Sequence, residues 1–176
     1  MKEKLKKIWK TLSESKDGIR KFVRNSFIVV ICFWIMFAFI IGTTTAGSYD
    51  MSPALTMGDR LVYSRLDKKP VAHDVIVFEK DGEARVARVV AIPGDTVEIT
   101  PEGSLIVNGN CILEDRINEP TYPYNEYVSY PITLAENEYF VLADNRRTGV
   151  DSRYYGTVKA KEIKGTLILV IRRHNF

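Results

Sequence analysis

The chain has 176 residues, of which 45% are hydrophobic and 27% charged, and its formal net charge is +3. Residues 1–25 carry nine Lys and Arg side chains against three acidic ones, which leaves residues 26–176 with a net charge of −3. This length suits one folded domain with an appendage, and a slightly acidic domain argues against nucleic-acid binding, which needs a basic patch on the folded part.

An apolar segment follows the basic leader. No charged residue occurs over 26–49, and the stretch 27–41 is apolar throughout. A helix needs about 20 mostly apolar residues to span a bilayer, so we predict a basic tail over 1–25 and a transmembrane helix over 26–47. The alternative is a cleaved signal peptide with Thr44-Thr45-Ala46 as its small-residue cleavage site.

The basic leader also predicts the orientation of this helix. Lys and Arg next to a membrane segment stay cytoplasmic, so we expect a single-pass protein of the cell membrane with residues 48–176 outside. Cys32 lies in the apolar segment and Cys111 in the outer domain, and on this interpretation they cannot pair within one chain. The outer domain is therefore expected to fold without a disulfide, and it is long enough to bury a core unaided.

The outer domain has the pattern of a mainly β structure. Apolar and β-branched runs bounded by turn residues predict strands at 61–64, 75–79, 85–91, 96–99, 139–143 and 166–171. Asn108-Gly109 lies between two further apolar runs and predicts a hairpin with a type I′ turn. No long helix is predicted after the apolar segment.

The segment 114–137 departs from this pattern. Its prolines and tyrosines are Pro120, Tyr122, Pro123, Tyr124, Tyr127, Tyr130 and Pro131. Prolines at this density are unfavourable in central strands, so we expect either a long loop or a segment that runs along the edge of the sheet. The tyrosines either cover the sheet or offer a binding surface, and the second case would make the chain a structural surface protein whose partner binds there.

Four sequence boxes occur in order along the outer domain. The first is Ser48-Tyr49-Asp50-Met51-Ser52-Pro53-Ala54-Leu55, and the others cover 73–78, 87–95 and 143–156. They resemble the boxes of the type I signal peptidase family over about residues 45–172. The resemblance implies a signal peptidase I-like β-domain preceded by one N-terminal transmembrane helix. It also implies a shallow apolar groove for the small side chains of a signal peptide.

This chain has other residues at the positions where the resemblance places the catalytic groups of the family. The Ser nucleophile falls at Asp50, the Lys general base at Ala87, and a Ser that helps to orient the base at Gly149. The last box also departs from the family at Ala143, where the family has a glycine. A carboxylate is a weak attacker of amides, and alanine has no group that accepts a proton. We therefore predict no catalytic residue at these degenerate positions, and a pseudoenzyme of the family instead of an enzyme.

Other residues of the boxes are candidates for binding or support. The residues predicted to line a partner-binding groove are Ser48, Asp50, Met51 and Pro53. A supporting network of ion pairs and turns is predicted from Asp144, Arg146, Asp151 and Arg153. No Cys/His cluster has the spacing of metal ligands, so neither a metal nor another cofactor is predicted.

The chain is also similar to the signal peptidase-like proteins encoded in streptococcal pilus loci. That resemblance implies a Gram-positive cell surface and a role in assembling covalently polymerised pili beside a sortase. On this hypothesis the groove binds a pilin precursor, or another signal-peptide-like segment, as a chaperone-like factor. The alternative is an active membrane endopeptidase with an atypical nucleophile, Ser48 or Ser52. A further possibility for hydrolysis is that Asp50 shares a proton with Asp144 or Asp151.

Overall fold

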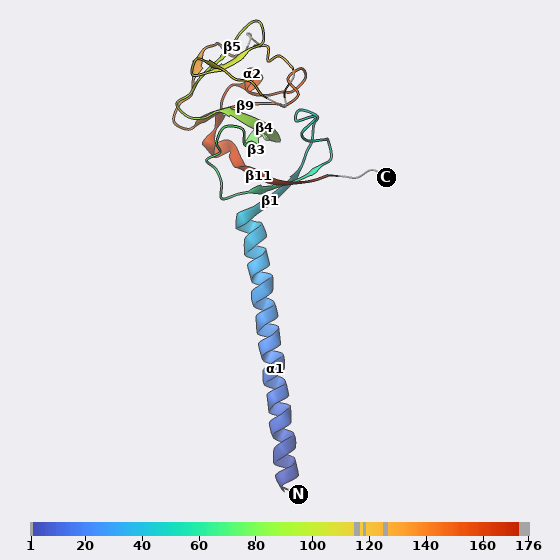
Figure 1. The fold of residues 1–176 in the computed structure, drawn as a ribbon. Coiled ribbons are helices and arrows are strands. Elements are labelled where there is room, and N and C mark those ends of the chain that lie inside the picture. The colour runs from blue at the N-terminus through green and yellow to red at the C-terminus, as the bar shows by residue number, and fades with distance from the viewer. Residues whose placement is uncertain (1, 115–116, 118, 125–126, 173–176) are drawn as a thin grey trace. The chain divides into compact units, whose positions relative to one another are not determined.

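The computed structural model describes residues 2–114, 117, 119–124 and 127–172, and the chain divides into two units after Ile40. The N-terminal unit is one helical element, in which α1 (Lys2–Ile35) continues as the π-helical stretch η1 (Met36–Ile40) (Figure 1). Lys16–Ile40 is long and apolar enough to cross a membrane, and its most apolar window buries no residue within the structure. This confirms the prediction of an N-terminal apolar helix that could span a membrane.

The helical structure ends earlier than the sequence predicts. We expect a helix to residue 47, whereas Ile41–Thr45 form strand β1, which pairs antiparallel with β2 (Arg60–Ser64) along its whole length. Composition explains the difference, because three consecutive threonines follow Gly42 and β-branched side chains favour a strand over a helix. The β-domain therefore begins inside the segment that apolar composition assigns to the membrane.

The domain from Ile41 onward contains two antiparallel sheets among the described residues (Figure 1). The larger has the strand order β1-β2-β11-β3-β4-β9-β10, and the smaller has the order β7-β6-β5-β8. The remaining strands are β3 (Val75–Lys80), β4 (Glu83–Ala91), β5 (Thr96–Ile99), β6 (Leu105–Val107), β7 (Asn110–Cys111), β8 (Ile132–Thr133), β9 (Glu138–Leu142), β10 (Val158–Lys159) and β11 (Ile163–Ile171). Two short helical turns, α2 (Ser152–Tyr155) and η2 (Ala160–Glu162), complete the domain.

The mainly β prediction is confirmed. Each of the six runs predicted as strands forms one, with ends that differ by three residues at most. The hairpin prediction is also confirmed: Asn108 and Gly109 connect β6 to β7 with φ values of 52° and 79°. Positive φ at both central positions is what a type I′ turn requires.

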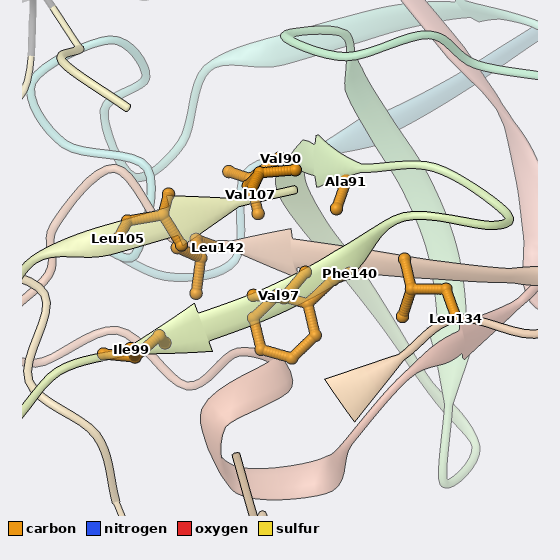
Figure 2. Packing of buried hydrophobic residues seen from close by; sticks show 9 residues of the cluster. All are labelled: Val90, Ala91, Val97, Ile99, Leu105, Val107, Leu134, Phe140 and Leu142. Atoms are coloured by element: carbon orange, nitrogen blue, oxygen red, sulfur yellow. The ribbon is translucent and has the colours of Figure 1, made fainter. Parts of the chain in front are cut away.

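Three apolar clusters form the core of the domain. The first joins the end of β4 to β5, β6 and β9 and contains the residues shown in Figure 2: Val90, Ala91, Val97, Ile99, Leu105, Val107, Leu134, Phe140 and Leu142. The second covers β3, β4 and β9 and includes Ala87 and Phe78. The third contains Ala46, Met51, Leu55 and Leu61, and it fixes the segment between β1 and β2 by packing. Asp50 lies within that fixed segment.

Candidate functional site

A pocket of about 370 Å³ lies between residues 46–55 and the first half of β4. Its lining residues are Ala46, Gly47, Ser48, Asp50, Met51, Leu55, Glu83, Ala84, Arg85 and Val86. Three of the four predicted groove residues thus meet there, while Pro53 lies outside the lining. Our sequence analysis missed the wall formed by β4, although these four residues directly precede Ala87 and two of them, Arg85 and Val86, lie on a predicted strand.

Asp50 is held at the pocket through its backbone and its side chain. Its carbonyl oxygen accepts a hydrogen bond from the Asn145 N–H at 2.8 Å. Its carboxylate Oδ2 accepts one from the Ser48 hydroxyl, also at 2.8 Å, and Ser48 Oγ accepts from the Asp50 N–H at 3.4 Å. The two side chains therefore form a hydroxyl–carboxylate pair inside the pocket.

Ala87 lies apart from the pocket lining. Its side chain is 2% exposed and belongs to the cluster that covers β3, β4 and β9. Side chains alternate along a strand, so Arg85 shares this face, and its guanidinium carbon lies 5.8 Å from the ring centroid of Tyr155. Arg85 Nη2 donates to Glu83 Oε2 at 2.7 Å, while Nε is buried without a partner among the described residues. Arginine stays protonated, so this side chain cannot replace a lysine base.

The other groups near Tyr155 are also unsuited to act as a base. Lys80 Nζ lies 5.6 Å from the Tyr155 ring centroid, donates to the Thr157 carbonyl at 3.1 Å and pairs with Glu162 at 3.4 Å. Burial, followed by the charge of Asp151, raises the pKa of Tyr155, which keeps its hydroxyl protonated near neutral pH. Asp50 is the carboxylate of the described pocket that contacts a hydroxyl, so it can accept a proton from Ser48.

The four predicted supporting residues form three separate ion pairs in the described part of the chain. Asp144 accepts from Arg88 Nε and Nη2 at 2.8 and 2.6 Å. Asp151 accepts from Arg153 Nε and Nη2 at 2.9 Å each, and both side chains are fully buried. Arg146, also fully buried, donates to Glu114 Oε2 at 2.6 Å. Our sequence analysis did not identify Arg88 and Glu114 as partners.

Two of these arginines attach the Tyr/Pro-rich segment to the last box. Besides Glu114, Arg146 binds the Thr121 hydroxyl at 2.7 Å, and burial lowers the pKa of this arginine. Arg153 donates to the Tyr122 carbonyl at 3.3 Å and lies 4.7 Å from the ring centroid of Tyr124. Within the segment 114–137, the described residues up to Pro131 form no strand, while Ile132–Thr133 form β8 at the edge of the smaller sheet, so the segment contains both a long loop and an edge strand. Buried arginines therefore hold its first part, and pairing of β8 with β5 holds its second.

Gly149 and Ala143, the two altered positions of the last box, lie against each other. A Cβ atom placed on Gly149 would overlap the Ala143 Cβ and lie 2.6 Å from the Asn145 carbonyl oxygen and 3.6 Å from that of Asp50. Ala143 stands where the resemblance places a glycine, and Gly149 where it places a serine. The two changes are therefore sterically coupled, because the Cβ atoms of residues 143 and 149 would occupy the same space.

This overlap predicts a non-additive pair of substitutions. Gly149→Ser should lower the free energy of unfolding by about 1–3 kcal/mol, the usual cost of overpacking. Adding Ala143→Gly should recover part of that loss, since the Asn145 carbonyl oxygen stays close. Urea denaturation of the two single variants and the double variant gives the coupling energy. Additive losses would contradict the steric explanation.

The chain is similar to known proteins in both sequence and fold. A family model described as signal peptidase, peptidase S26, matches residues 19–172. The chain is 30% identical to a probable signal peptidase I-2 of Synechocystis sp., over 67% of this chain and 57% of that protein. It is 28% identical to signal peptidase I S of Bacillus subtilis, over 86% of this chain and 88% of that protein. A crystal structure of a signal peptidase I from Enterococcus faecalis matches with a TM-score of 0.50 and 32% identity, covering 58% of this chain and 99% of the solved one.

These relatives contradict the prediction that the chain is not an enzyme. All three are named as forms of signal peptidase I, and signal peptidase I is an active peptidase family. Their moderate sequence identity to this chain therefore favours an enzyme. The chain spans less than two thirds of the length of the Synechocystis protein. Asp50, Ala87 and Gly149 still cannot form the Ser–Lys pair that the resemblance implies, so hydrolysis by this chain would need other groups.

Proposed function

Because the chain belongs to the signal peptidase family, peptidase S26, we propose that its pocket binds an extended segment of an exported precursor protein. The observation that carries this proposal is an unpaired edge of β4 beside the pocket. β3, β4 and β9 are neighbours in the larger sheet (Figure 1). β4 pairs with β3 from Glu83 to Arg88, but with β9 only from Arg88 onward.

The backbone of β4 directs hydrogen-bonding groups to this edge. The N–H and C=O of Val89 bond to Asp74 and His73, on the side of β3. Bonding direction alternates along an antiparallel strand, so the backbone groups of Ala84 and Val86 point to the opposite side. No strand of the described chain pairs with them there. An extended peptide can pair with such an edge and place alternate side chains in the adjoining pocket.

Replacing an edge donor tests this binding mode. Ala84→Pro should weaken binding of a peptide from the cleavage region of an exported precursor by about tenfold, because one main-chain hydrogen bond is lost. The ladder to β3 should survive, since proline is tolerated where the N–H faces away from the sheet. Fluorescence anisotropy with the full chain in detergent micelles measures the affinity.

The matched control for this test is Ala84→Ser, which keeps the N–H at the same exposed position. It should bind the peptide as tightly as the parent chain, and circular dichroism should show the same β signal for both variants. Equal affinities for the proline and serine variants would reject pairing at this edge.

A second candidate function is hydrolysis of the bound segment, and the Ser48–Asp50 hydrogen bond favours it. A serine hydroxyl attacks an amide when a nearby base takes its proton. The 2.8 Å between Ser48 Oγ and Asp50 Oδ2 lies within the range expected for a general base. In this proposal Ser48 is the nucleophile and Asp50 the base, and cleavage of a precursor by the purified chain tests it.

The proposal also names the bound precursor and the side of the membrane on which the β-domain lies. We propose a pilin precursor as the bound protein, with a sortase acting nearby, on the resemblance of the altered boxes to proteins of pilus loci. The basic leader, residues 1–25, supports a cytoplasmic N-terminus and a β-domain outside the membrane. Loss of polymerised pili in cells carrying Ala84→Pro, but not Ala84→Ser, would support this assignment, and normal pili in both would reject it.

A further inference from the structure

We propose that the pocket selects a basic side chain, lysine or arginine, from the peptide that it binds. This inference rests on the proposed binding function and adds the chemistry of the bound segment. It starts from the charges of the pocket, whose lining contains one cation, Arg85, and two carboxylates, Glu83 and Asp50. The selection follows from which of these charges is already compensated.

The charge of Arg85 is compensated within the pocket wall. Its Nη2 lies 2.7 Å from Glu83 Oε2, and the two side chains are 27% and 70% exposed. The guanidinium also lies over the ring of Tyr155, which adds a cation–π contact. An acidic residue of a peptide would have to compete with Glu83 for the charge of Arg85, although Arg85 Nε is buried without a partner among the described residues.

The charge of Asp50 is not compensated by any described residue. Oδ2 accepts a hydrogen bond from the neutral Ser48 hydroxyl, while Oδ1 accepts none from the residues that the structure describes. No cation of the described chain lies within ion-pair distance of this carboxylate. The pocket therefore carries one unmatched negative charge, with one oxygen open to a further donor.

The walls of the pocket suit the stem of a basic side chain. Met51, Leu55 and Val86 supply apolar surface, and the first two are buried in the third core cluster. Lysine and arginine pack their methylene groups along such surface while the charged head reaches a polar partner. Norleucine would bury the same stem but leave Asp50 partly desolvated and unpaired, which is unfavourable.

A peptide series measures this preference directly. An alanine-rich decapeptide is prepared with lysine, norleucine or glutamate at each position in turn, and its binding to the full chain in detergent micelles is measured. At the position that enters the pocket, lysine should bind about tenfold more tightly than norleucine, as expected for a hydrogen bond to a charged group. The advantage should shrink as salt is raised, because screening weakens a partly exposed pair.

Three variants assign the preference to Asp50. Asp50→Asn keeps the shape of the side chain and should abolish the advantage of lysine. Asp50→Lys should transfer the advantage to the glutamate peptide. Glu102→Gln removes a negative charge from an exposed residue outside the pocket lining, so it should retain the advantage.

The outcomes distinguish failure of this inference from failure of the proposed peptide-binding function. If lysine, norleucine and glutamate peptides bind the parent chain equally, or if Asp50→Asn keeps the preference, the inference is wrong and the binding function stands. A preference for glutamate in the parent chain would also overturn it and assign recognition to Arg85. If no peptide of the series binds at any position, the proposed binding function fails as well.

Discussion

Replacing Asp151 by asparagine is expected to lower the free energy of unfolding of the β-domain by about 3–5 kcal/mol, the usual cost of breaking a buried ion pair from one side. The carboxylate is fully buried and accepts from the Ala143 N–H, the Arg153 N–H and two guanidinium nitrogens of Arg153. The substitution leaves a fully buried guanidinium without its counter-charge. Asparagine keeps one oxygen that can cap α2, but its amide NH2 group then replaces the oxygen that accepts from the Ala143 N–H and from Arg153 Nη2.

The aromatic residues allow this loss to be measured in the full chain. All nine tyrosines follow residue 48, whereas both tryptophans, Trp9 and Trp34, precede it. The tyrosine near-ultraviolet circular dichroism therefore reports on the β-domain during urea denaturation in micelles. Glu83→Gln is the matched control, because the Glu83 side chain is 70% exposed and its pair with Arg85 should contribute under about 1 kcal/mol. Similar losses in both variants would show that burial does not set the energy of the Asp151 pair.

If the Ser48–Asp50 pair hydrolyses the bound segment as proposed, Ser48→Ala is expected to slow cleavage of a signal-peptide-bearing precursor by at least about a thousandfold. Removing the nucleophile of a serine peptidase removes most of the catalysis that depends on the hydroxyl and its base. Ser48 is the hydroxyl of the pocket lining that contacts a carboxylate, at 2.8 Å from Asp50. Gel analysis of precursor processing by the purified chain in detergent measures the rate.

Two further variants make this result specific. Ser52→Ala removes a neighbouring hydroxyl that lies outside the pocket lining, and it should leave the rate unchanged. Asp50→Ser combined with Ala87→Lys places a serine–lysine pair at the positions that the family resemblance implies. If the parent chain does not cleave but the combined variant does, the pocket binds substrate and Ser48–Asp50 is not the catalytic pair.

Local patterns predicted most of the fold. Alternating apolar residues and turn residues placed the strands, and Asn108-Gly109 placed a hairpin, because these signals depend on neighbours in sequence. The end of the membrane-type helix was predicted wrongly, since apolar composition does not distinguish a spanning helix from the first strand after it. Pairing of β1 with β2 depends on residues about 20 positions later, which a local pattern does not contain.

The candidate site was predicted only in part for the same reason. Ser48, Asp50 and Met51 are close in sequence, so their shared pocket wall could be expected. Glu114 and Arg88 are separated from their partners by 32 and 56 residues, and no local pattern identifies such pairs. The opposite wall of the pocket also requires a sheet to bring β4 next to the segment after β1.

The overlap between the side-chain positions of 143 and 149 has an evolutionary consequence. From the present pair, a glycine at 143 and a serine at 149 can be reached one substitution at a time in two orders. Placing serine first passes through an overpacked intermediate, whereas removing the Ala143 methyl group first opens space before the larger side chain arrives. The second order avoids the contact with the Ala143 methyl group, although the Asn145 carbonyl oxygen stays close to a side chain at 149 in both orders. The order of the two substitutions therefore decides how strongly the intermediate is overpacked.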